Sequence, residues 1–550
     1  MLSILFNWLY IGVTVFCLGS GFSALSGILF GYKLKRMDSV LMAGIIIATI
    51  YAQIFSLFAG VGITANLVLI VGCAIIFFIC RKSMISFIKS CWTSYSISKR
   101  ILLFALIVLW AYFTSRGYIH LDSDLYHAQS IRWIEEYGVV PGQGNLHGRF
   151  AYNSSSFALS ALYSMRFFSD ESIHAVSGFF ALLLSITALD ITKSWKGRKF
   201  ILSDYARVAA VYYLTTIADE VVSPASDYVI MCMIFFIVIK WLDCLADEED
   251  SAVITPYALL CVACVYAITL KLTAGVILIL LLKPAYELLR QKKWRDIFLY
   301  LGMGLIVAVP WFARTVMISG WLLYPFPALD LFDVDWKMSA ELIKVDAAQI
   351  STWGKALYNS AMADAPVNVW FPNWFSTTLS GTEKILILGD FVCILVYVLG
   401  LIWTFFKKKW GNLDKLLVLG AVICSYLFWQ FSAPLIRYGY AYVLLVAFLV
   451  IGWLIISIEK NKIVYYAVIL YGIYKAVVLG DYITNSYLVE CYIYQQDYGE
   501  YEMMPYQIGE FTFYTPAEGD LQGDDYFPAT PTMSEAVPRG DRIEDGFRFQ

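Results

Sequence analysis

The segment HLDSDLYHAQSIRWIEEYG, residues 120–138, concentrates acidic, basic and aromatic side chains in a chain that is otherwise mostly apolar. Four of them recur at intervals of four, three and four residues, so a helix would place them on one face: Asp122, Tyr126, Gln129 and Trp133. An acid, a phenol, an amide and an indole together are typical of a site for a polar substrate, particularly a sugar. A partly desolvated carboxylate can accept a proton from an attacking hydroxyl, so Asp122 is a candidate catalytic base.

The same stretch allows other interpretations. Asp122 can be a helix N-cap, with Asp124 in the first turn where an acid is favoured by the helix dipole. In an extended backbone both carboxylates would point the same way and, with His127, could ligate Mg²⁺ or Mn²⁺. In a helix the two aspartates diverge by about 200°. The spacing therefore leaves Asp124 open as a second catalytic residue, a metal ligand or a helix charge.

A second polar segment, GNLHGRFAYNSS at 144–155, sets hydrogen-bonding side chains among glycines. It is long enough to act as a lid that orders the sugar or the acceptor. The candidate substrate-binding residues are Asn145, His147, Arg149 and Asn153, together with Tyr126, His127, Gln129 and Trp133 from the first segment. The alternative is a self-capped loop in which Asn153 is the N-cap of the following helix.

Cations interrupt three apolar stretches: Lys271 in YAITLKLTAGVILILL, Arg314 in VPWFARTVMISGWLLYPFP and Arg437 in SAPLIRYGYAY. Cations in or beside a bilayer are costly and usually functional. Each one alone could be an interfacial residue whose charged end reaches water. Together, on the same side as the acidic segment, they would form a cradle for a phosphate or pyrophosphate.

The elements that position these residues follow from composition. The 550 residues are 60% hydrophobic, whereas roughly half of the residues in soluble domains are apolar. Only 15% are charged, and the mean hydropathy is +0.67. The net charge of -3 and the lack of a basic aromatic stretch give no reason to expect nucleic acid as a partner. We expect an all-α polytopic membrane protein with about 12–14 transmembrane helices. The apolar runs lie near 4–30, 39–58, 62–80, 101–118, 173–192, 204–218, 226–242, 253–270, 272–285, 294–315, 384–405, 413–432, 437–456 and 462–480.

Lysine and arginine orient this bundle, because they fall on alternate connections, which the positive-inside rule assigns to the cytoplasm. These connections are Lys33 to Arg36, Arg81 to Arg100, Lys193 to Lys199, Arg290 to Arg295, Lys407 to Lys409 and Lys460 to Lys462. The outer connections are then 119–172, the turn from Asp219 to Asp227, 316–383, the turn from Ala433 to Arg437, and the tail after 480. All the candidate site residues are therefore expected on the extracytoplasmic side of the membrane.

Three parts are expected along the chain. Residues 1–100 supply N-terminal extra helices, and 101–480 form a transmembrane core with outer loops 119–172 and 316–383. Residues 481–550 are rich in tyrosine, acid, glycine and proline, which predicts a small extracytoplasmic domain of short strands and turns. The aspartates from Asp520 to Asp525 are interpreted as a solvated turn.

Three segments resemble motifs of the GT-C class of polytopic glycosyltransferases, which includes protein O-mannosyltransferases and lipid A aminoarabinose transferases. The matching residues are Asp122, Tyr126, His127 and Trp133; then Pro310, Trp311, Arg314, Gly320, Tyr324 and Pro325; then Pro434, Arg437 and Tyr438. Thr315 replaces the usual asparagine, and Trp321-Leu322 replaces an Asn-Pro pair. The resemblance covers roughly residues 101 to 456. GNLHGRFAYNSS and the terminal DRIEDGFRF resemble a bacterial branch of the class.

The resemblance implies a helical GT-C core in the cytoplasmic membrane and an inverting transfer of a sugar from a polyprenyl-phosphate donor. The acceptor would be an envelope glycan, lipid or protein on the outer side. An aspartate of the first outer loop would be the base, and cations near the outer face would hold the donor phosphate. Two alternatives remain: a transporter or flippase for a polar lipid or glycolipid, and a non-catalytic component of an envelope polysaccharide assembly.

Overall fold

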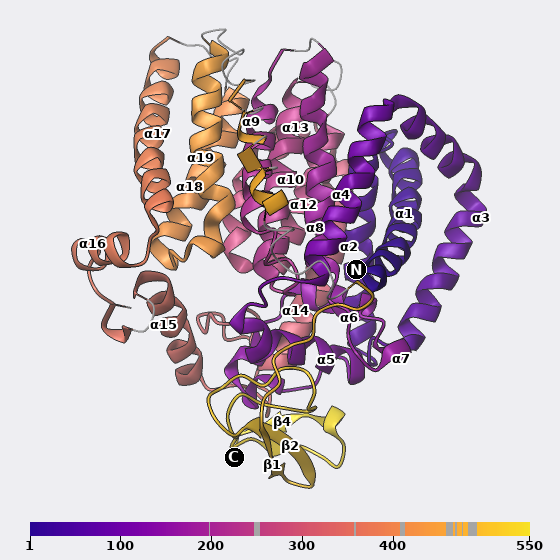
Figure 1. Cartoon of the computed structure of the whole chain (residues 1–550), viewed down its shortest axis with the longest axis vertical. Helices are drawn as coiled ribbons and strands as arrows, with labels where there is room; N and C mark the ends of the chain where they lie inside the picture. The colour runs from indigo at the N-terminus through magenta and orange to yellow at the C-terminus, as the bar shows by residue number, and fades with distance from the viewer. Residues whose placement is uncertain are drawn as a thin grey trace.

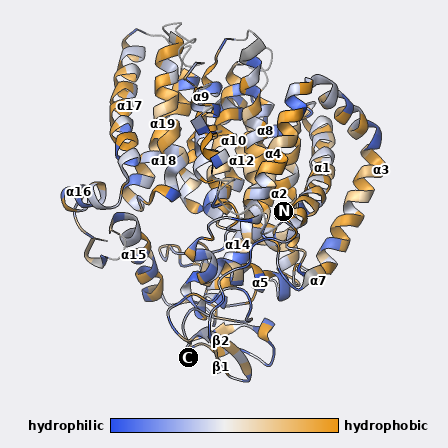
Figure 2. Ribbon diagram, viewed as in Figure 1, coloured by the Kyte–Doolittle hydropathy of each residue, from blue (hydrophilic) through white to orange (hydrophobic). Residues whose placement is uncertain are grey.

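The computed structural model describes residues 1–549 except 197–198, 247–253, 357–358, 363, 408–412, 458–465, 468–469, 473, 476 and 482–491. Most of its long helices stand side by side in a bundle, and the tail lies at one end (Figure 1). Among the described residues, eleven helices are long and apolar enough to cross a membrane. Hydrophobic residues run along these helices (Figure 2). The prediction of an all-α, multi-pass membrane protein is thus confirmed at the level of fold class.

Most helices of the bundle agree closely with the apolar runs in the sequence, but the helix that begins at Ile63 continues to Ser94, although its predicted run ends at 80. Their bounds are α1 (Leu2–Phe30), α2 (Met37–Ser56), α3 (Ile63–Ser94), α4 (Ile97–Ser115), α8 (Val176–Ala188), α9 (Leu202–Thr216), α10 (Ser226–Ala246), α12 (Thr255–Leu270), α13 (Leu282–Arg290), α14 (Trp294–Ser319), α17 (Gly381–Phe406), α18 (Leu413–Ser432) and α19 (Ile436–Ser457). The 3-10 segment η4 (Leu189–Lys196) continues α8, and the 3-10 segment η5 (Leu272–Leu281) leads into α13.

The described residues contain eleven candidate membrane spans, fewer than the predicted 12–14 transmembrane helices, and the difference has identifiable causes. The runs at 204–218 and 253–270 form α9 and α12, which at 15 and 16 residues are shorter than the eleven candidate spans. The run at 462–480 lies partly outside the described residues. Between α12 and η5 the backbone of Lys271 is extended, with φ −157° and ψ 126°, so the predicted interruption at this cation is confirmed.

Shorter elements build the two segments that the sequence predicts as outer loops, 119–172 and 316–383, and we keep the names first and second outer loop for them. The first loop contains η1 (Ser123–His127), α5 (Ala128–Glu136), η2 (Gln143–Asn145), η3 (Gly148–Ala151), α6 (Ser155–Tyr163) and α7 (Arg166–Ser169). The second contains α15 (Ala340–Ala356), η6 (Ser360–Met362) and α16 (Val367–Thr377). Both lie at the end of the bundle that carries the tail, as the sequence predicts (Figure 1).

Helix α10 forms the centre of the bundle. Almost all of its 21 residues are buried, and it packs against α8, α9, α12, α18 and α19. A helix that is apolar on every side must be surrounded by other helices or by lipid. Its few charged side chains lie near its two ends, with Asp227 in the first turn and Lys240 and Asp243 near the last.

The N-terminal helices pack directly on this bundle. Asn7 Nδ2 donates to the carbonyl of Tyr163 at 2.6 Å. Helices α1 and α2 cross at glycines, since a Cβ added to Gly44 would lie 1.8 Å from the carbonyl oxygen of Val15. Small residues of this kind allow membrane helices to approach closely. The predicted segment 1–100 is therefore joined to the core by buried contacts.

The tail contains the predicted short strands. Strand β1 (Met503–Ile508) pairs antiparallel with β2 (Phe511–Pro516), in a register from Met503 opposite Pro516 to Ile508 opposite Phe511, and β3 (Val537–Pro538) pairs with β4 (Phe547–Arg548) beside the 3-10 turn η8 (Ile543–Asp545). The tail shares one hydrophobic core with the first outer loop. This core contains Trp133, Val140, Leu146, Phe150, Ile508, Phe513, Ala536 and Phe547.

Candidate charged site at the tail end of the bundle

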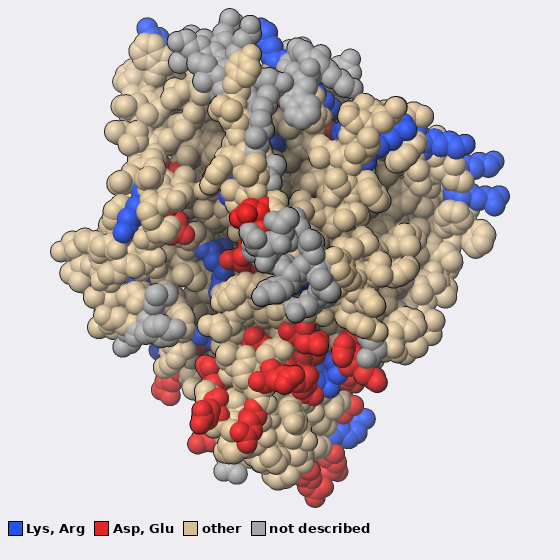
Figure 3. All heavy atoms as spheres, viewed as in Figure 1, with Lys and Arg blue, Asp and Glu red and all other residues tan. Residues whose placement is uncertain are grey.

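Five charged or titratable side chains meet where several helices end beside the first outer loop. We call them the tail-end cluster: His120, Asp122, Asp227, Lys271 and Arg437. In the space-filling view, basic atoms lie at the back of a recess above the tail, with acidic atoms nearby (Figure 3). The sequence predicted Asp122, Lys271 and Arg437 as site residues, and the structure brings these three together.

Local structure explains why these five residues lie at the same end of the bundle. Asp227 lies in the first turn of α10, where a carboxylate is favoured by the unsatisfied backbone N–H groups. Lys271 lies at the break after α12, and Arg437 lies in the first turn of α19, after the turn that contains Pro434. Asp122 immediately precedes η1. Each side chain thus comes from an element end, where the backbone leaves the apolar bundle.

The cluster is a connected set of ion pairs. Arg437 Nη2 lies 2.6 Å from Asp122 Oδ2, and Arg437 Nε lies 3.0 Å from Asp227 Oδ2. The Lys271 ammonium donates to Asp227 Oδ1 and lies 3.6 Å from the ring centroid of Tyr438. Two cations are therefore balanced by two carboxylates. Any further anion that enters must compete with one of these carboxylates.

His120 completes the arrangement as a neutral ring. Arg437 Nη1 lies against His120 Nε2, and the backbone N–H of Asp122 donates to His120 Nδ1 at 3.1 Å. Both ring nitrogens thus face groups that can only donate, which disfavours an imidazolium with two N–H groups. Nδ1 also lies 3.4 Å from Asp122 Oδ2. Burial and the charge of Arg437 lower the pKa of His120, which favours this neutral form.

Asp122 is ionised and keeps one oxygen available. Burial opposes its charge, but the charge of Arg437 and its hydrogen bond to Asp122 more than offset this, and the pKa of Asp122 falls to about 2. The contacts of Asp122 involve Oδ2, and within the described part of the chain Oδ1 accepts no hydrogen bond. With its side chain 26% exposed, Asp122 can meet a hydroxyl that approaches from solvent.

Asp124 has different surroundings. It is buried, its carboxylate accepts the N–H of Gly499 at 3.0 Å, and its backbone carbonyl accepts the N–H groups of Gln522 and Gly523, each at 3.0 Å. Burial raises its pKa. Asp124 therefore fastens the tail to the first outer loop, and the structure does not place it beside Asp122 in a catalytic pair.

The predicted metal ligands are also separated. Asp122 contacts Arg437 and Asp124 contacts Gly499, whereas His127 is buried with its ring 4.3 Å from that of Tyr126. Burial lowers the pKa of His127 to about 3. Across the described residues, no three His, Cys, Asp or Glu side chains form a group that could hold a metal ion. The predicted Mg²⁺ or Mn²⁺ site gains no support from this geometry.

Gln129 and Trp133 do not converge on Asp122. Gln129 Nε2 donates to the carbonyl of Tyr526 at 2.8 Å, and the Trp133 ring is fully buried in the core shared with the tail. The segment begins with the π-helical turn η1, which has wider hydrogen-bonded loops than an α-helix and so breaks the spacing on which the prediction relied. Of the other residues on the predicted helix face, only Tyr126 lies close to the tail-end cluster. The charges of Asp122 and Asp227 help to raise the pKa of its hydroxyl.

In the second predicted segment, two residues make local or structural contacts. Asn145 Nδ2 donates to the carbonyls of Trp336 and Phe547, at 2.9 and 3.2 Å, and so joins the two outer loops to the tail. His147 Nδ1 accepts the N–H of Arg149 at 3.3 Å, and burial lowers the pKa of His147 to about 4. The self-capped interpretation is supported at His147.

Arg149 is the exception in this segment. It donates to the Tyr152 hydroxyl at 3.3 Å, and no carboxylate among the described residues lies within ion-pair distance. Tyr152 and Tyr324 both donate to Asp346 Oδ2, which joins the first outer loop to α15. Burial would lower the pKa of Arg149, but the surrounding phenols and carboxylates, Asp122 among them, raise it. Arg149 thus remains a cation available to a substrate.

Arg314 lies in a different network from the other two predicted phosphate ligands. It is fully buried, and it donates from Nε to Asn153 Oδ1 at 3.0 Å and from Nη1 to the Ser56 hydroxyl. Asn153 also donates to the carbonyl of Trp311. The N-cap of α6 is Ser154, so the predicted capping role of Asn153 is wrong. Arg314 and Asn153 join α14, α2 and the first outer loop.

The structure adds two cluster residues that the sequence analysis missed. Asp227 opens α10 directly after a predicted outer turn, and His120 begins the quoted polar segment. A charged residue at the outer end of an apolar run was the available signal for Asp227. Its pairing with both Lys271 and Arg437 depends on how α10, α12 and α19 pack, which no local pattern contains.

Two carboxyl groups lie at the junction between the first outer loop and the tail. Glu135 accepts from the Ser172 hydroxyl at 3.0 and 2.9 Å, and Asp524 pairs with Arg166 at 3.2 Å. Burial raises the pKa of Glu135 to about 7 and that of Asp524 to about 6. The interpretation of residues 520–525 as a solvated turn is therefore wrong at Asp524, whose side chain is only 13% exposed and pairs with Arg166.

Fold and site together define a multi-pass membrane protein with a partly exposed ion-pair cluster beside its outer loops. The chain belongs to the family described as a domain of unknown function (DUF8201), which matches residues 1–444. No curated protein and no solved structure matches the chain. The family match includes the N-terminal helices and every residue of the tail-end cluster, and it ends before the tail.

Proposed function

We propose that this protein is a GT-C-type membrane glycosyltransferase. It transfers a sugar from a polyprenyl-phosphate donor to an envelope glycan, lipid or protein acceptor on the outer side of the cytoplasmic membrane. The observation that carries the proposal is the pairing of Asp122 with Arg437, beside Lys271, while Asp122 Oδ1 accepts no hydrogen bond within the described residues. A base and two phosphate ligands are thus adjacent.

The orientation rests on charge. Lys and Arg atoms crowd the far end of α3 and α4, whereas many Asp and Glu atoms lie on the tail and the loops beside it (Figure 3). The positive-inside rule places the basic end in the cytoplasm. The tail-end cluster then faces the extracytoplasmic side, where carrier-linked sugars would be used.

The chemistry follows from the cluster's contacts. The acceptor hydroxyl attacks the anomeric carbon, its proton passes to Asp122 Oδ1, and the bond from that carbon to the phosphate oxygen breaks. The electron pair leaves with polyprenyl phosphate, whose charge Arg437 and Lys271 stabilise. Attack opposite to the leaving group inverts the configuration of the sugar.

Donor binding would also activate the base. In the free protein Arg437 holds the pKa of Asp122 at about 2, so the carboxylate is a weak base. A phosphate at Arg437 adds a nearby negative charge and competes with Asp122 for the guanidinium. Both effects raise the pKa of Asp122 and make it a stronger proton acceptor. Arg149, without a carboxylate partner among the described residues, can contact the sugar or a second phosphate.

The test uses purified full-length protein in nanodiscs with a panel of polyprenyl-phosphate monosaccharides and an envelope extract as acceptor. The expected result is release of free polyprenyl phosphate together with transfer of the sugar in inverted configuration. Asp122→Asn should reduce release at least a hundredfold, while Asp520→Asn, at an exposed position on the tail, should leave it unchanged. No release from any donor, or movement of intact donor across a bilayer without release, would overturn the proposal.

A further inference from the structure

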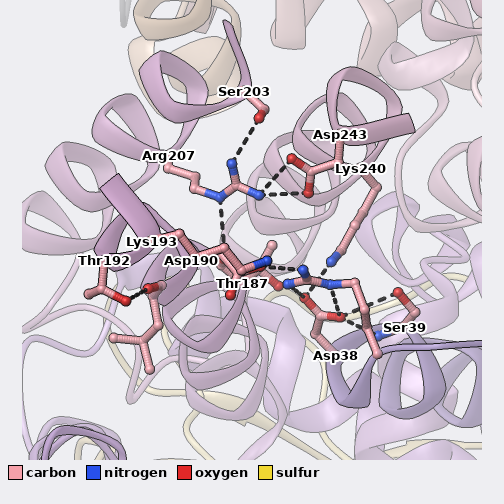
Figure 4. A network of polar contacts seen from close by, with 12 residues as sticks. Asp38, Ser39, Thr187, Asp190, Thr192, Lys193, Ser203, Arg207, Lys240 and Asp243 are labelled. Atoms are coloured by element: carbon pink, nitrogen blue, oxygen red, sulfur yellow. Dashed lines mark hydrogen bonds and ion pairs between the residues drawn. The ribbon is translucent and has the colours of Figure 1, made fainter. Parts of the chain in front are cut away.

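A second group of charges lies at the other end of α10. We call it the far-end cluster: Arg36, Asp38, Asp190, Lys193, Arg207, Lys240 and Asp243. Lys240 is 13 residues after Asp227 on the same helix, which separates the two clusters by about 20 Å at 1.5 Å per residue. In the close view, side chains from α2, α9 and α10 converge, with Asp38 beside Lys240 and Asp243 beside Arg207 (Figure 4).

The carboxylates of this cluster are fully engaged. Asp38 Oδ2 lies 2.5 Å from Lys240 Nζ and 3.2 Å from Arg36 Nη2. Asp190 pairs with Arg36 and with Lys193, the latter at 3.1 Å. Asp243 accepts two hydrogen bonds from Arg207 Nη2, at 2.6 and 2.7 Å. The acids of the far-end cluster are thus all paired, and an entering anion must share Arg36, Lys193 and Lys240 with them.

A cavity of about 620 Å³ opens at this cluster. In the described part of the chain its charged lining consists of five cations and two acids: Lys35, Arg36, Lys193, Arg207, Lys240, Asp190 and Asp243. With the ion-pair partners just outside the lining, Asp38, Asp204 and Lys99, the described residues give six cations and four acids, an excess of two positive charges. Lys193 is 54% exposed, so an entering ligand can reach it from solvent.

The rest of the cavity wall is apolar. It continues from Ser39 to Ile50 along α2, which is about 16 Å at 1.5 Å per residue, and it is closed by side chains of α1, α12 and α14. Leu25 of α1 and Ile306 of α14 line it and are also exposed on their helices. In a bilayer these side chains contact lipid, so a hydrocarbon chain can enter from the side.

From these features we infer that the far end of the bundle binds a lipid phosphate monoester with a single alkyl or isoprenoid chain. The phosphate lies among Lys35, Lys193 and Lys240, and the chain follows α2 between α1 and α14. A dianionic monoester matches the excess of cations better than the singly charged diester of a glycerophospholipid. A soluble phosphate would leave the apolar wall without a partner. This inference does not depend on the proposed transfer reaction.

The experiment uses a farnesyl phosphate analogue with a diazirine on its chain and the full chain in phosphatidylcholine nanodiscs. After irradiation, mass spectrometry should locate crosslinks in the stretches Met42 to Ile50 and Met303 to Val307, both of which line the cavity. Unlabelled farnesyl phosphate should compete. Farnesol, inorganic phosphate and phosphatidylglycerol at the same concentrations should not.

Lys193→Ala should lower labelling about tenfold, because it removes a charged hydrogen-bond donor from the phosphate. Its exposed position makes a folding defect unexpected. The matched control is Lys89→Ala, which removes an exposed cation of α3 outside the cavity and should leave labelling unchanged.

Labelling confined to other segments, or equal labelling of the Lys193→Ala protein, would overturn the inference. Competition by farnesol would show an apolar cavity without phosphate recognition. Competition by phosphatidylglycerol or by inorganic phosphate would show a different ligand. Crosslinks near Lys271 and Arg437 alone would assign the probe to the tail-end cluster, which separates a failure here from a failure of the proposed transferase.

Discussion

The two ends of α10 carry the same residue types in different settings. At the tail end two cations and two carboxylates balance, and Asp122 is partly exposed with Oδ1 free of hydrogen bonds in the described residues. At the far end Asp38 is 2% exposed and contacts both Lys240 and Arg36 beside an apolar cavity. Chemically alike ion pairs thus differ in exposure and in spare contacts, and on this difference we base the proposal of proton transfer at the tail end and of ligand binding at the far end.

The largest expected effect is on turnover at the tail end. Asp122→Asn should reduce single-turnover transfer at least a hundredfold, since general bases contribute about 10²–10⁴-fold. The protein should stay folded and bind the carrier lipid, because Arg437 keeps its pair with Asp227.

Asp124→Asn should affect attachment of the tail, and it should have the larger effect on turnover only if activity also requires added divalent metal. Assays with and without chelator distinguish these roles, and an active Asp122→Asn enzyme would remove Asp122 as the base.

The corresponding change at the far end should act on stability. Asp38→Asn leaves the buried ammonium of Lys240 without its carboxylate, which should lower the free energy of unfolding by about 3 kcal/mol, as when one partner of a buried ion pair is removed. Unfolding in detergent micelles measures this. The double variant Asp38→Asn with Lys240→Met should recover part of the loss. Equal stability of Asp38→Asn and wild type would contradict the structural difference between the two ends.

Arg437→Ala should weaken binding of a polyprenyl-phosphate sugar by about 2 kcal/mol, the scale expected when a partly buried charged contact is lost. The matched change in the third predicted cation, Arg314→Met, should lower stability and leave the affinity of the folded fraction unchanged, because Arg314 contacts Asn153 and Ser56. Titration of the donor into both proteins measures the affinities. Unchanged affinity in Arg437→Ala would exclude it as a phosphate ligand.

The smallest expected effect is the pH dependence of the stability of the junction between the first outer loop and the tail. Glu135 and Asp524 have pKa values of about 7 and 6, above the ordinary carboxyl range. The folded state binds their protons more tightly than the unfolded state, so their contribution favours folding at low pH and is lost as pH rises from about 4 to 7. Hydrogen exchange in residues 500–549 should therefore become faster over that range, and Glu135→Gln should reduce the change. Exchange independent of pH, after correction for its intrinsic rate, would contradict this.

Much of the fold could be predicted from the sequence, because membrane helices are determined by long local apolar runs. The bounds of α2, α10, α18 and α19 differ from the predicted runs by a few residues at most. The break at Lys271 was also predictable, since a cation within an apolar run cannot stay in lipid without a partner. The same local reasoning singled out Asp122 and Arg437 as candidate site residues, and the structure pairs them.

Tertiary structure alone decided which of these residues meet. Asp227 joins Lys271 to Arg437 because α10, α12 and α19 pack side by side, a relation that connects residues up to 210 positions apart. Arg314, with the same chemistry and a matching motif, instead bonds to Asn153. Asp124, two residues from Asp122, holds the tail, because the π-helical turn and the chain from Gly499 set its direction. Local sequence determines where a charge can be tolerated, whereas the packing of distant segments determines which partner neutralises it.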